Sequence, residues 1–211
     1  MRDAATFWDG IAERYAASKV SDPETYELTL RRTAERLRPL DRALEIGCGT
    51  GTTALRLAPS VASLTATDLS GEMIRIAEGR AAEAGAQNVR LLRAGLSDAA
   101  LEGEPYDAVL AFNLLHLLED LPAAARRVRA LLKPGGLFIS KSAAVPSPQP
   151  LSFRLIRLVV PVMQALGKAP AVVFRPVAEV QAVIEAAGFS LLAAEDHGAP
   201  GRGRFIVAKA V

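Results

Sequence analysis

The sequence contains few of the residues that form covalent cross-links and metal centres. One cysteine, Cys48, and two histidines, His116 and His197, are spread over 211 residues. A single thiol excludes an intrachain disulfide, and the sequence has no thiol pairs for a zinc site. We therefore expect no bound metal, and a reducing compartment, the cytoplasm, as the location of the protein.

Long apolar runs and a strong charge of one sign are missing as well. No stretch of about 18 uncharged apolar residues is present, so a transmembrane helix is not expected. The first ten residues, MRDAATFWDG, lack the apolar centre of a secretory signal. The formal net charge is only +2, and no aromatic residues interleave with the arginines at 31–32 and 126–129, so we expect no nucleic-acid partner.

Short apolar runs alternate with helical patterns over most of the chain. Asp22 before Pro23, Ser70 and Asp120 are expected helix N-caps, and KPGG at 133–136 is expected to form a tight turn. This alternation predicts a parallel sheet that is covered by helices on both faces. The predicted strands are 43–46, 64–67, 89–93, 106–112 and 137–141, and the predicted helices are 23–38, 52–58, 71–84 and 122–132.

The C-terminal part departs from this alternation. Apolar residues at helical spacing predict a helix over 177–187 that Gly188 ends. Two further strands, 189–194 and 205–208, are separated only by a loop. Adjacent strands joined in this way should be antiparallel, so we expect a hairpin that closes a sheet of seven strands.

A glycine-rich loop follows the first predicted strand in LEIGCGTG, residues 44–51. Such a loop lets a ligand approach bare backbone and presents amide groups at a helix N-terminus. The dinucleotide fingerprint would need glycine at Thr52, and the lysine of a phosphate-binding loop is absent. The loop therefore predicts a small nucleoside-type ligand. A purely structural turn is disfavoured, because three alternating glycines cost backbone entropy.

An acidic residue, Asp68, ends the second predicted strand about 20 residues further on. A carboxylate at this place can accept hydrogen bonds from both hydroxyls of a ribose. A helix-capping role is the weaker alternative, since Ser70 already offers the cap.

Four motifs occur in a fixed order, namely LEIGCGTG, TDLS (67–70), PYDAV (105–109) and LKPGG (132–136). Together they resemble the class I S-adenosylmethionine-dependent methyltransferases over about residues 7–141, and the closing helix and hairpin resemble the end of that family. The resemblance implies an α/β fold, a Rossmann-like doubly wound seven-stranded sheet, mostly parallel with an antiparallel C-terminal hairpin strand. It also implies S-adenosyl-L-methionine as cofactor.

The same resemblance divides the chain into parts of one domain. Residues 1–40 would form an N-terminal helical cap and residues 41–141 the cofactor-binding core. Residues 142–176 would form an apolar helical lid insert, and residues 177–211 the helix and hairpin that complete the sheet.

The resemblance further implies which residues bind the cofactor. The three glycines would line its methionine part through backbone, and Glu45 would organise the turn or approach that part. Asp68 would bind the ribose, with Leu69 and Met73 against the adenine. The residues implied are Tyr15, Glu45, Gly47, Cys48, Gly49, Gly51, Asp68, Leu69, Met73, Leu96, Ser97, Asn113 and Leu114.

Two parts of this set carry alternatives. Trp8 and Tyr15 resemble the aromatic residues of a cofactor-covering N-terminal helix, but they can equally pack onto the domain. Leu96 stands where the family often has an acid that meets the adenine amino group. Asp98, or backbone atoms of Leu96 and Ser97, would then make the adenine contact.

The residues after the fourth strand bear on the methyl acceptor. Relatives that methylate exocyclic amines of DNA carry Asn/Asp-Pro-Pro-aromatic there, whereas this chain has NLLH at 113–116. His116 and His197 are candidate general bases, because the predicted topology places both at the ligand-binding edge of the sheet. The alternatives are a packed His116 and a solvated His197.

The insert at 142–176 contains LSFRLIRLVVPVMQALGK, an apolar stretch with a narrow polar edge, in which Pro161 should kink the helix. A lid over an apolar acceptor, a dimer contact and a helix on a membrane surface all fit it. We expect a methyltransferase for a small, apolar or mixed acceptor, as a monomer or homodimer. A protein or RNA methyltransferase and a non-catalytic cofactor-binding module are the alternatives.

Overall fold

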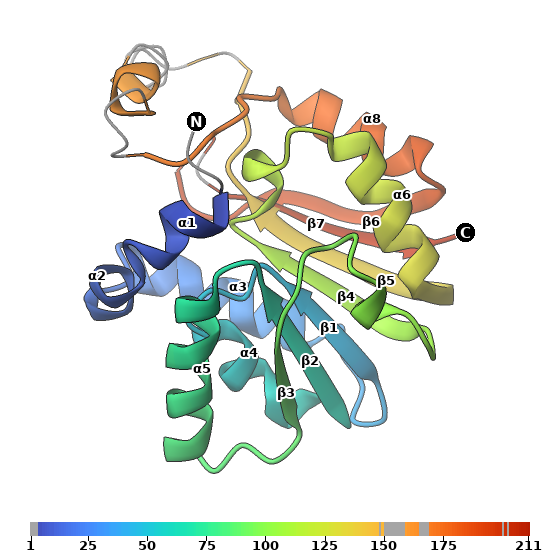
Figure 1. The fold of residues 1–211 in the computed structure, drawn as a ribbon. Coiled ribbons are helices and arrows are strands. Elements are labelled where there is room, and N and C mark those ends of the chain that lie inside the picture. The colour runs from blue at the N-terminus through green and yellow to red at the C-terminus, as the bar shows by residue number, and fades with distance from the viewer. Residues whose placement is uncertain (1–3, 148, 150–158, 165–168, 200, 202) are drawn as a thin grey trace.

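The structure, a computed structural model, describes residues 4–147, 149, 159–164, 169–199, 201 and 203–211. Seven strands form one sheet in the order β3-β2-β1-β4-β5-β7-β6 (Figure 1). The sheet confirms the predicted number of strands. The strands are β1 (Arg42–Ile46), β2 (Ser63–Asp68), β3 (Val89–Arg93), β4 (Tyr106–Phe112), β5 (Leu132–Ser142), β6 (Phe189–Asp196) and β7 (Arg204–Ala210).

Helices cover both faces of this sheet. One face packs against α3, α4 and α5, and the other packs against α6 and α8 (Figure 1). Two short helices, α1 and α2, lie beside α5 at one end of the molecule, and residues 4–17, which contain them, are called the cap below. The helices are α1 (Ala4–Asp9), α2 (Ala12–Ala17), α3 (Pro23–Ala34), α4 (Thr52–Leu57), α5 (Gly71–Glu83), α6 (Leu121–Leu131) and α8 (Val177–Ala186), with single 3-10 turns η1 (Ala58–Ser60), η2 (Ala99–Leu101) and η3 (Leu115–Leu117).

The direction of the strands brings their carboxyl ends to one edge. β1 to β5 pair in parallel, and β7 runs antiparallel between β5 and β6. The predicted C-terminal hairpin is therefore confirmed. In an open sheet of this kind, ligands bind at the carboxyl edge where the strand order reverses, here between β1 and β4.

Apart from Glu45, the buried residues of the two central strands, β1 and β4, are apolar on both faces, as expected for parallel strands under two helical layers. Residues 108–111 of β4 are fully buried. In β1, Leu44 and Ile46 face the α6 side, while Ala43 faces the α4 side. Because these strands are firmly packed, the loops that follow β1 and β4 begin at defined positions on the carboxyl edge of the sheet.

The expected N-caps are confirmed by hydrogen bonds. Asp22 accepts from the Thr25 amide at 3.0 Å, Ser70 from the Met73 amide at 3.1 Å, and Asp120 from the Ala123 amide at 2.8 Å. Each side chain satisfies an amide in the first helical turn that has no partner within its own helix.

Two predicted boundaries are wrong. The helix expected over 23–38 ends at Ala34, because the amides of Arg36 and Leu37 bond three residues back, that of Leu37 to the Ala34 carbonyl at 3.1 Å. The Arg38 amide then bonds to Asp41 at 2.9 Å, which turns the chain into β1. The stretch 133–136, expected as a turn, is the irregular start of β5, which pairs at Leu132 and resumes regular pairing at Leu137.

The insert at 142–176 is described only in part. Residues 159–164, with Pro161 among them, are helical, while 148, 150–158 and 165–168, with most of the predicted polar edge, lie outside the described residues. The returning segment is anchored on the core, since the Val173 amide bonds to the His116 carbonyl at 2.8 Å. Within the part of the chain that the structure describes, no helix is long and apolar enough to cross a membrane.

Candidate active site

The glycine loop between β1 and α4 forms a tight cradle at the carboxyl edge of the sheet. Gly47, Gly49 and Gly51 all have left-handed backbone, with φ of 68°, 54° and 76°. A Cβ at Gly47 would lie 2.9 Å from Leu114 Cδ1, and one at Gly51 would lie 2.8 Å from Ala77 Cβ. Glycine is therefore required at 47 and 51 both for conformation and for space.

Asp68, at the end of β2, is bonded to this loop. Its Oδ2 accepts a hydrogen bond from the Gly49 amide at 2.9 Å, and its Oδ1 accepts one from the Ser70 amide at 2.9 Å. Burial raises the pKa of the carboxyl, and these two amides oppose that rise. Each oxygen has a second lone pair, so Asp68 keeps acceptor capacity for the hydroxyls of a ligand.

Glu45 lies in β1 just before the loop and is 1% exposed. Its Oε2 is buried without a hydrogen-bond partner among the described residues. Burial, with a smaller contribution from the charge of Asp68, raises the pKa of Glu45 to about 8. A buried carboxyl oxygen beside an amide cradle is a site that a ligand ammonium group would satisfy.

Cys48 is buried within the loop, and its thiol donates to the Gly49 carbonyl at 3.6 Å. Burial raises the pKa of this thiol well above its usual value. The side chain therefore remains a neutral thiol that packs the loop against the core.

The cap places one aromatic side chain, Tyr15, against the loop. Tyr15 comes within 3.6 Å of the position of a Cβ on Gly49. Trp8 packs edge-on against Tyr15, with ring centroids 6.1 Å apart. Tyr15 is 45% exposed, so packing onto the domain does not use its whole surface. The packing of the two rings on each other is observed, and the covering of a cofactor by Tyr15 stays a prediction.

The residues expected around an adenine are divided between surface and core. Leu69 is 49% exposed and its Cδ2 approaches Gly95, whereas Met73 is 1% exposed. Leu96 packs on the core, and its carbonyl accepts a hydrogen bond from Arg127 Nε at 3.2 Å. Ser97 is exposed. The candidate substitute acid, Asp98, caps η2 through the Ala100 amide at 2.9 Å.

The turn after β4 faces the glycine loop. Asn113 has a φ of 53° and is the one non-glycine residue with left-handed backbone in the described ranges. Its side chain is exposed, and its amide bonds to the Lys141 carbonyl at 2.7 Å. Leu114 then contacts Gly47. Strained backbone of this kind clusters at functional sites, and the structure brings Leu114, one of the two expected residues, to the cradle.

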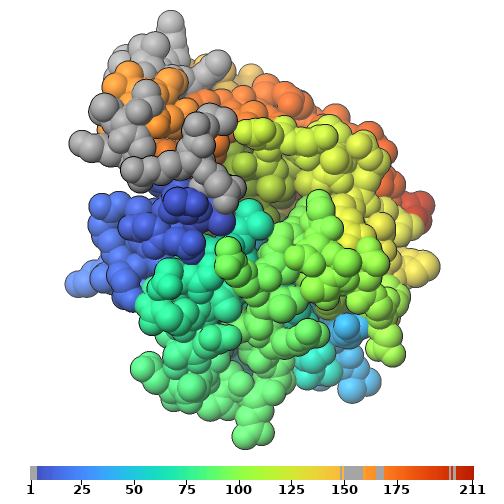
Figure 2. Space-filling view, in the orientation of Figure 1, coloured from blue at the N-terminus to red at the C-terminus, as the bar shows by residue number. Residues whose placement is uncertain are grey.

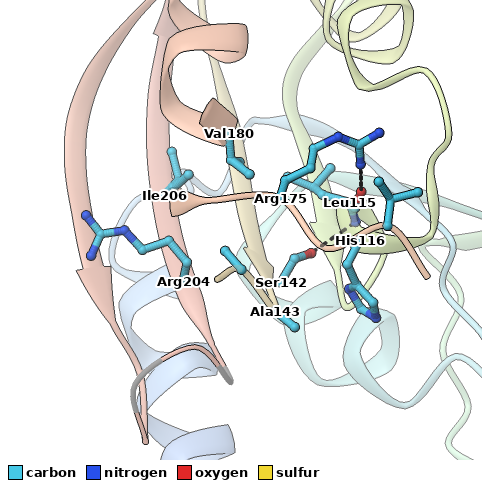
Figure 3. A pocket seen from close by; sticks show the side chains of 10 residues that line it. Leu115, His116, Ser142, Ala143, Arg175, Val180, Arg204 and Ile206 are labelled. Carbon is cyan, nitrogen blue, oxygen red and sulfur yellow. Dashed lines mark hydrogen bonds between the residues drawn. The ribbon is translucent and has the colours of Figure 1, made fainter. Parts of the chain in front are cut away.

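His116, in η3, lines a small hollow next to this turn. Figure 3 shows its imidazole pointing away from Arg175, whose guanidinium donates to the Leu115 carbonyl. Nδ1 of His116 is buried and has no hydrogen-bond partner in the described part of the chain. Burial, and then the charge of Lys141, lowers the pKa of His116 to about 4, so the ring is neutral at pH 7.

His197 is buried, and the expectation that it is solvated is wrong. Its exposure is 2% because the hairpin folds back onto α3. Nδ1 is 2.9 Å from Thr29 Oγ1, Nε2 is 3.1 Å from Glu195 Oε1, and the ring stacks on Phe205 with centroids 4.4 Å apart. Both ring nitrogens are thus engaged with the protein. The structure does not bring His197 together with the glycine loop.

Sequence reasoning missed the polar residues that fasten the cap. Asp9 Oδ1 accepts hydrogen bonds from Ser70 Oγ at 2.6 Å and from the Glu72 amide at 3.1 Å. Arg80 on α5 donates both to the glycine loop and to α2. The contacts of Asp9 with α5 and of Arg80 with α2 join residues more than 60 positions apart, and nothing in their local sequence indicates them.

Known proteins share both the sequence motifs and the fold. A family model for a methyltransferase domain matches residues 44–138. An uncharacterized methyltransferase of Mycobacterium tuberculosis is 36% identical over 104 residues, 49% of this chain and 51% of that one. A ubiquinone biosynthesis O-methyltransferase of Methylobacterium nodulans is 34% identical over 148 residues, 66% of this chain and 59% of that one. The chain spans between half and three fifths of the length of these relatives.

A solved structure agrees with the fold. Magnesium protoporphyrin IX methyltransferase of Synechocystis PCC 6803, solved with bound S-adenosylhomocysteine, superposes with a TM-score of 0.74 at 16% identity, over 99% of this chain and 98% of that one. At this identity the likeness concerns the fold alone. The sequence matches show a methyltransferase domain over residues 44–138, and with the shared fold they support a class I S-adenosylmethionine-dependent methyltransferase.

Proposed function

We propose that this chain transfers a methyl group from S-adenosylmethionine to a small organic acceptor. The observation that carries the proposal is the cradle of Gly47, Gly49 and Gly51, with Asp68 at its side and the unpaired carboxyl oxygen of Glu45 below it. These residues fit the cofactor. Asp68 offers acceptors to a ribose, the loop amides line the methionine part, and Glu45 offers a partner to its ammonium group.

The cofactor, when bound, supplies a methyl group on a positively charged sulfur. The acceptor would attack the methyl carbon in line, with the sulfur as the leaving group. The protein contributes position and exclusion of water. Tyr15 and Leu69, both about half exposed, would cover the cofactor, and Leu114 would limit the space above Gly47.

His116 is the acceptor-side polar group that the geometry favours. His116 follows Asn113 by three positions in the sequence. Its Nδ1 atom is buried and has no hydrogen-bond partner among the described residues. A pKa of about 4 makes this imidazole a weak base at neutral pH. His116 is therefore suited to hydrogen-bond an acceptor oxygen, and the acceptor would have to lose its proton readily by itself.

A small-molecule acceptor of apolar or mixed character is supported by two observations. The relative from Methylobacterium nodulans and the neighbour from Synechocystis are named for a ubiquinone pathway and for a porphyrin. In the described part of the insert, Val159 and Val162 are 57% and 60% exposed on one helix, as residues of an apolar lid would be without an acceptor. Catechols and hydroquinones are the acceptors to try first.

The test combines binding and turnover. Asp68→Ala should weaken S-adenosylhomocysteine binding at least 100-fold while the protein stays folded. The substitution removes the carboxylate that accepts hydrogen bonds from the Gly49 and Ser70 amides and, in the proposal, from the ribose hydroxyls. Asp120→Ala, which removes an exposed N-cap from α6, is the matched control and should bind as the wild type does. Wild-type binding by Asp68→Ala would contradict the placement of the ribose. Cofactor binding without methylation of any catechol or hydroquinone would favour the non-catalytic alternative.

A further inference from the structure

A single guanidinium on α5 joins the N-terminal cap to the glycine loop. Arg80 Nη1 donates to Thr50 Oγ1 at 2.6 Å and to Thr52 Oγ1 at 2.8 Å. Arg80 Nη2 donates to the carbonyl oxygen of Ala16, in α2, at 2.9 Å. Thr50 is 4% exposed, so the loop end of this contact is buried. The two terminal nitrogens of this planar group thus bond to two different segments, Nη1 to the glycine loop and Nη2 to α2.

Few buried apolar side chains hold the cap in its position. In its described residues, α1 buries no side chain and α2 buries only Ala12. Figure 2 shows this N-terminal segment (blue) lying against the blue-green surface of α5. The other polar contacts to α5 are those of Asp9 and the exposed ion pair of Glu13 with Arg75. A segment with so few buried apolar contacts opens easily.

Of the cap contacts described for α5, the one made by Arg80 also reaches the loop. Ala16 is the neighbour of Tyr15, whose ring lies over Gly49. Fixing the Ala16 carbonyl therefore holds Tyr15 in place, and the same guanidinium holds Thr50 between Gly49 and Gly51. One side chain thus contacts both the residue next to Tyr15 and the residue between Gly49 and Gly51.

We propose that Arg80 is a positioning residue that couples closure of the cap over the cofactor to the shape of the glycine loop. The inference rests on the proposed function, since S-adenosylmethionine is the molecule held between cap and loop. Arginine is required because its planar fork bonds two segments at once, whereas a lysine ammonium is a single point.

The experiment compares Arg80→Gln and Arg80→Lys with Arg75→Gln. Arg75 is the matched control, because it lies on the same helix and contacts the cap through Glu13 without touching the loop. Trp8 is the only tryptophan in the sequence and lies in the cap, so its fluorescence reports cap position without any cofactor. Both Arg80 variants should roughly double acrylamide quenching of Trp8, and Arg75→Gln should leave it unchanged.

The second readout is calorimetric binding of S-adenosylhomocysteine, which needs no acceptor. Both Arg80 variants should bind it about tenfold more weakly and release it faster, since a charge-assisted bridge is lost. Arg75→Gln should stay within about twofold, as expected for an exposed ion pair. Thermal unfolding verifies that each variant is folded. If Arg80→Gln does not fold, Arg80→Lys, which keeps the charge, carries the same test.

Three results would overturn the inference. They are wild-type affinity in the folded Arg80 variants, equal weakening by Arg75→Gln, and unchanged Trp8 quenching. Failure of the wild-type chain itself to bind S-adenosylhomocysteine would count against the proposed function instead, and the cofactor-free Trp8 measurement would still decide whether Arg80 holds the cap.

Discussion

Glu45→Gln is the substitution whose effect follows most directly from the structure. The wild-type carboxyl is 1% exposed, lies beneath the glycine loop, and has an oxygen without a partner among the described residues. Glutamine has nearly the same shape and cannot ionise. The variant therefore removes the charge of this position at every pH and leaves its packing almost unchanged.

The magnitude comes from the two pKa values. In the unfolded chain Glu45 has its usual pKa of 4.5, and in the folded protein burial raises the pKa to about 8. Between these values the unfolded chain has lost a proton that the folded chain keeps, so folding becomes less favourable as pH rises. The resulting penalty is below about 1 kcal/mol at pH 5 and roughly 3 kcal/mol at pH 7, an upper estimate.

Thermal unfolding of wild type and Glu45→Gln at pH 5, 6 and 7, without cofactor, measures this penalty. The free energy of unfolding of Glu45→Gln minus that of the wild type should increase by roughly 2 kcal/mol from pH 5 to pH 7. For a chain of this length that corresponds to about 4–8 °C in Tm. Glu104→Gln, whose side chain is 90% exposed, is the control and should show no such trend. Parallel pH profiles for wild type and Glu45→Gln would refute the reasoning.

Two further substitutions test the loop and the buried histidine. Gly51→Ala should lower the free energy of unfolding by about 1–3 kcal/mol and abolish tight S-adenosylhomocysteine binding, because the new Cβ meets Ala77 and φ is 76°. Gly79→Ala, where a Cβ meets nothing within 4 Å, is the control and should be neutral or stabilising in urea unfolding. His197→Ala should cost about 2–4 kcal/mol in the same assay with unchanged cofactor affinity, and a tenfold loss of affinity would contradict its structural role.

The sequence predicts best what short-range chemistry determines. The strand over 89–93 and the strand over 106–112 are found within the predicted limits, because apolar runs bounded by turn residues have few other ways to fold. The caps Asp22 and Ser70 follow from residue type and position alone. Asp68 lies beside the glycine loop, as the ends of neighbouring parallel strands must.

The features that escaped prediction depend on contacts between distant residues. His197 is buried because Thr29, 168 residues earlier, packs against it, and no local pattern signals that contact. From its position in a helix, Arg80 would be expected in solvent, and its contact with α2 depends on the packing of α2 against α5. The end of α3 at Ala34 depends on how Asp41 turns the chain toward β1. The lid prediction for 142–176 concerns residues that are described only in part.

The central claim is that the loop at 47–51 holds S-adenosylmethionine. Isothermal titration of the wild-type chain with S-adenosylmethionine, S-adenosylhomocysteine and NAD tests it most directly. The account predicts one site per chain for the first two ligands and no binding of NAD, because Thr52 stands where the dinucleotide fingerprint needs glycine. Binding of NAD, or of none of the three, would contradict it.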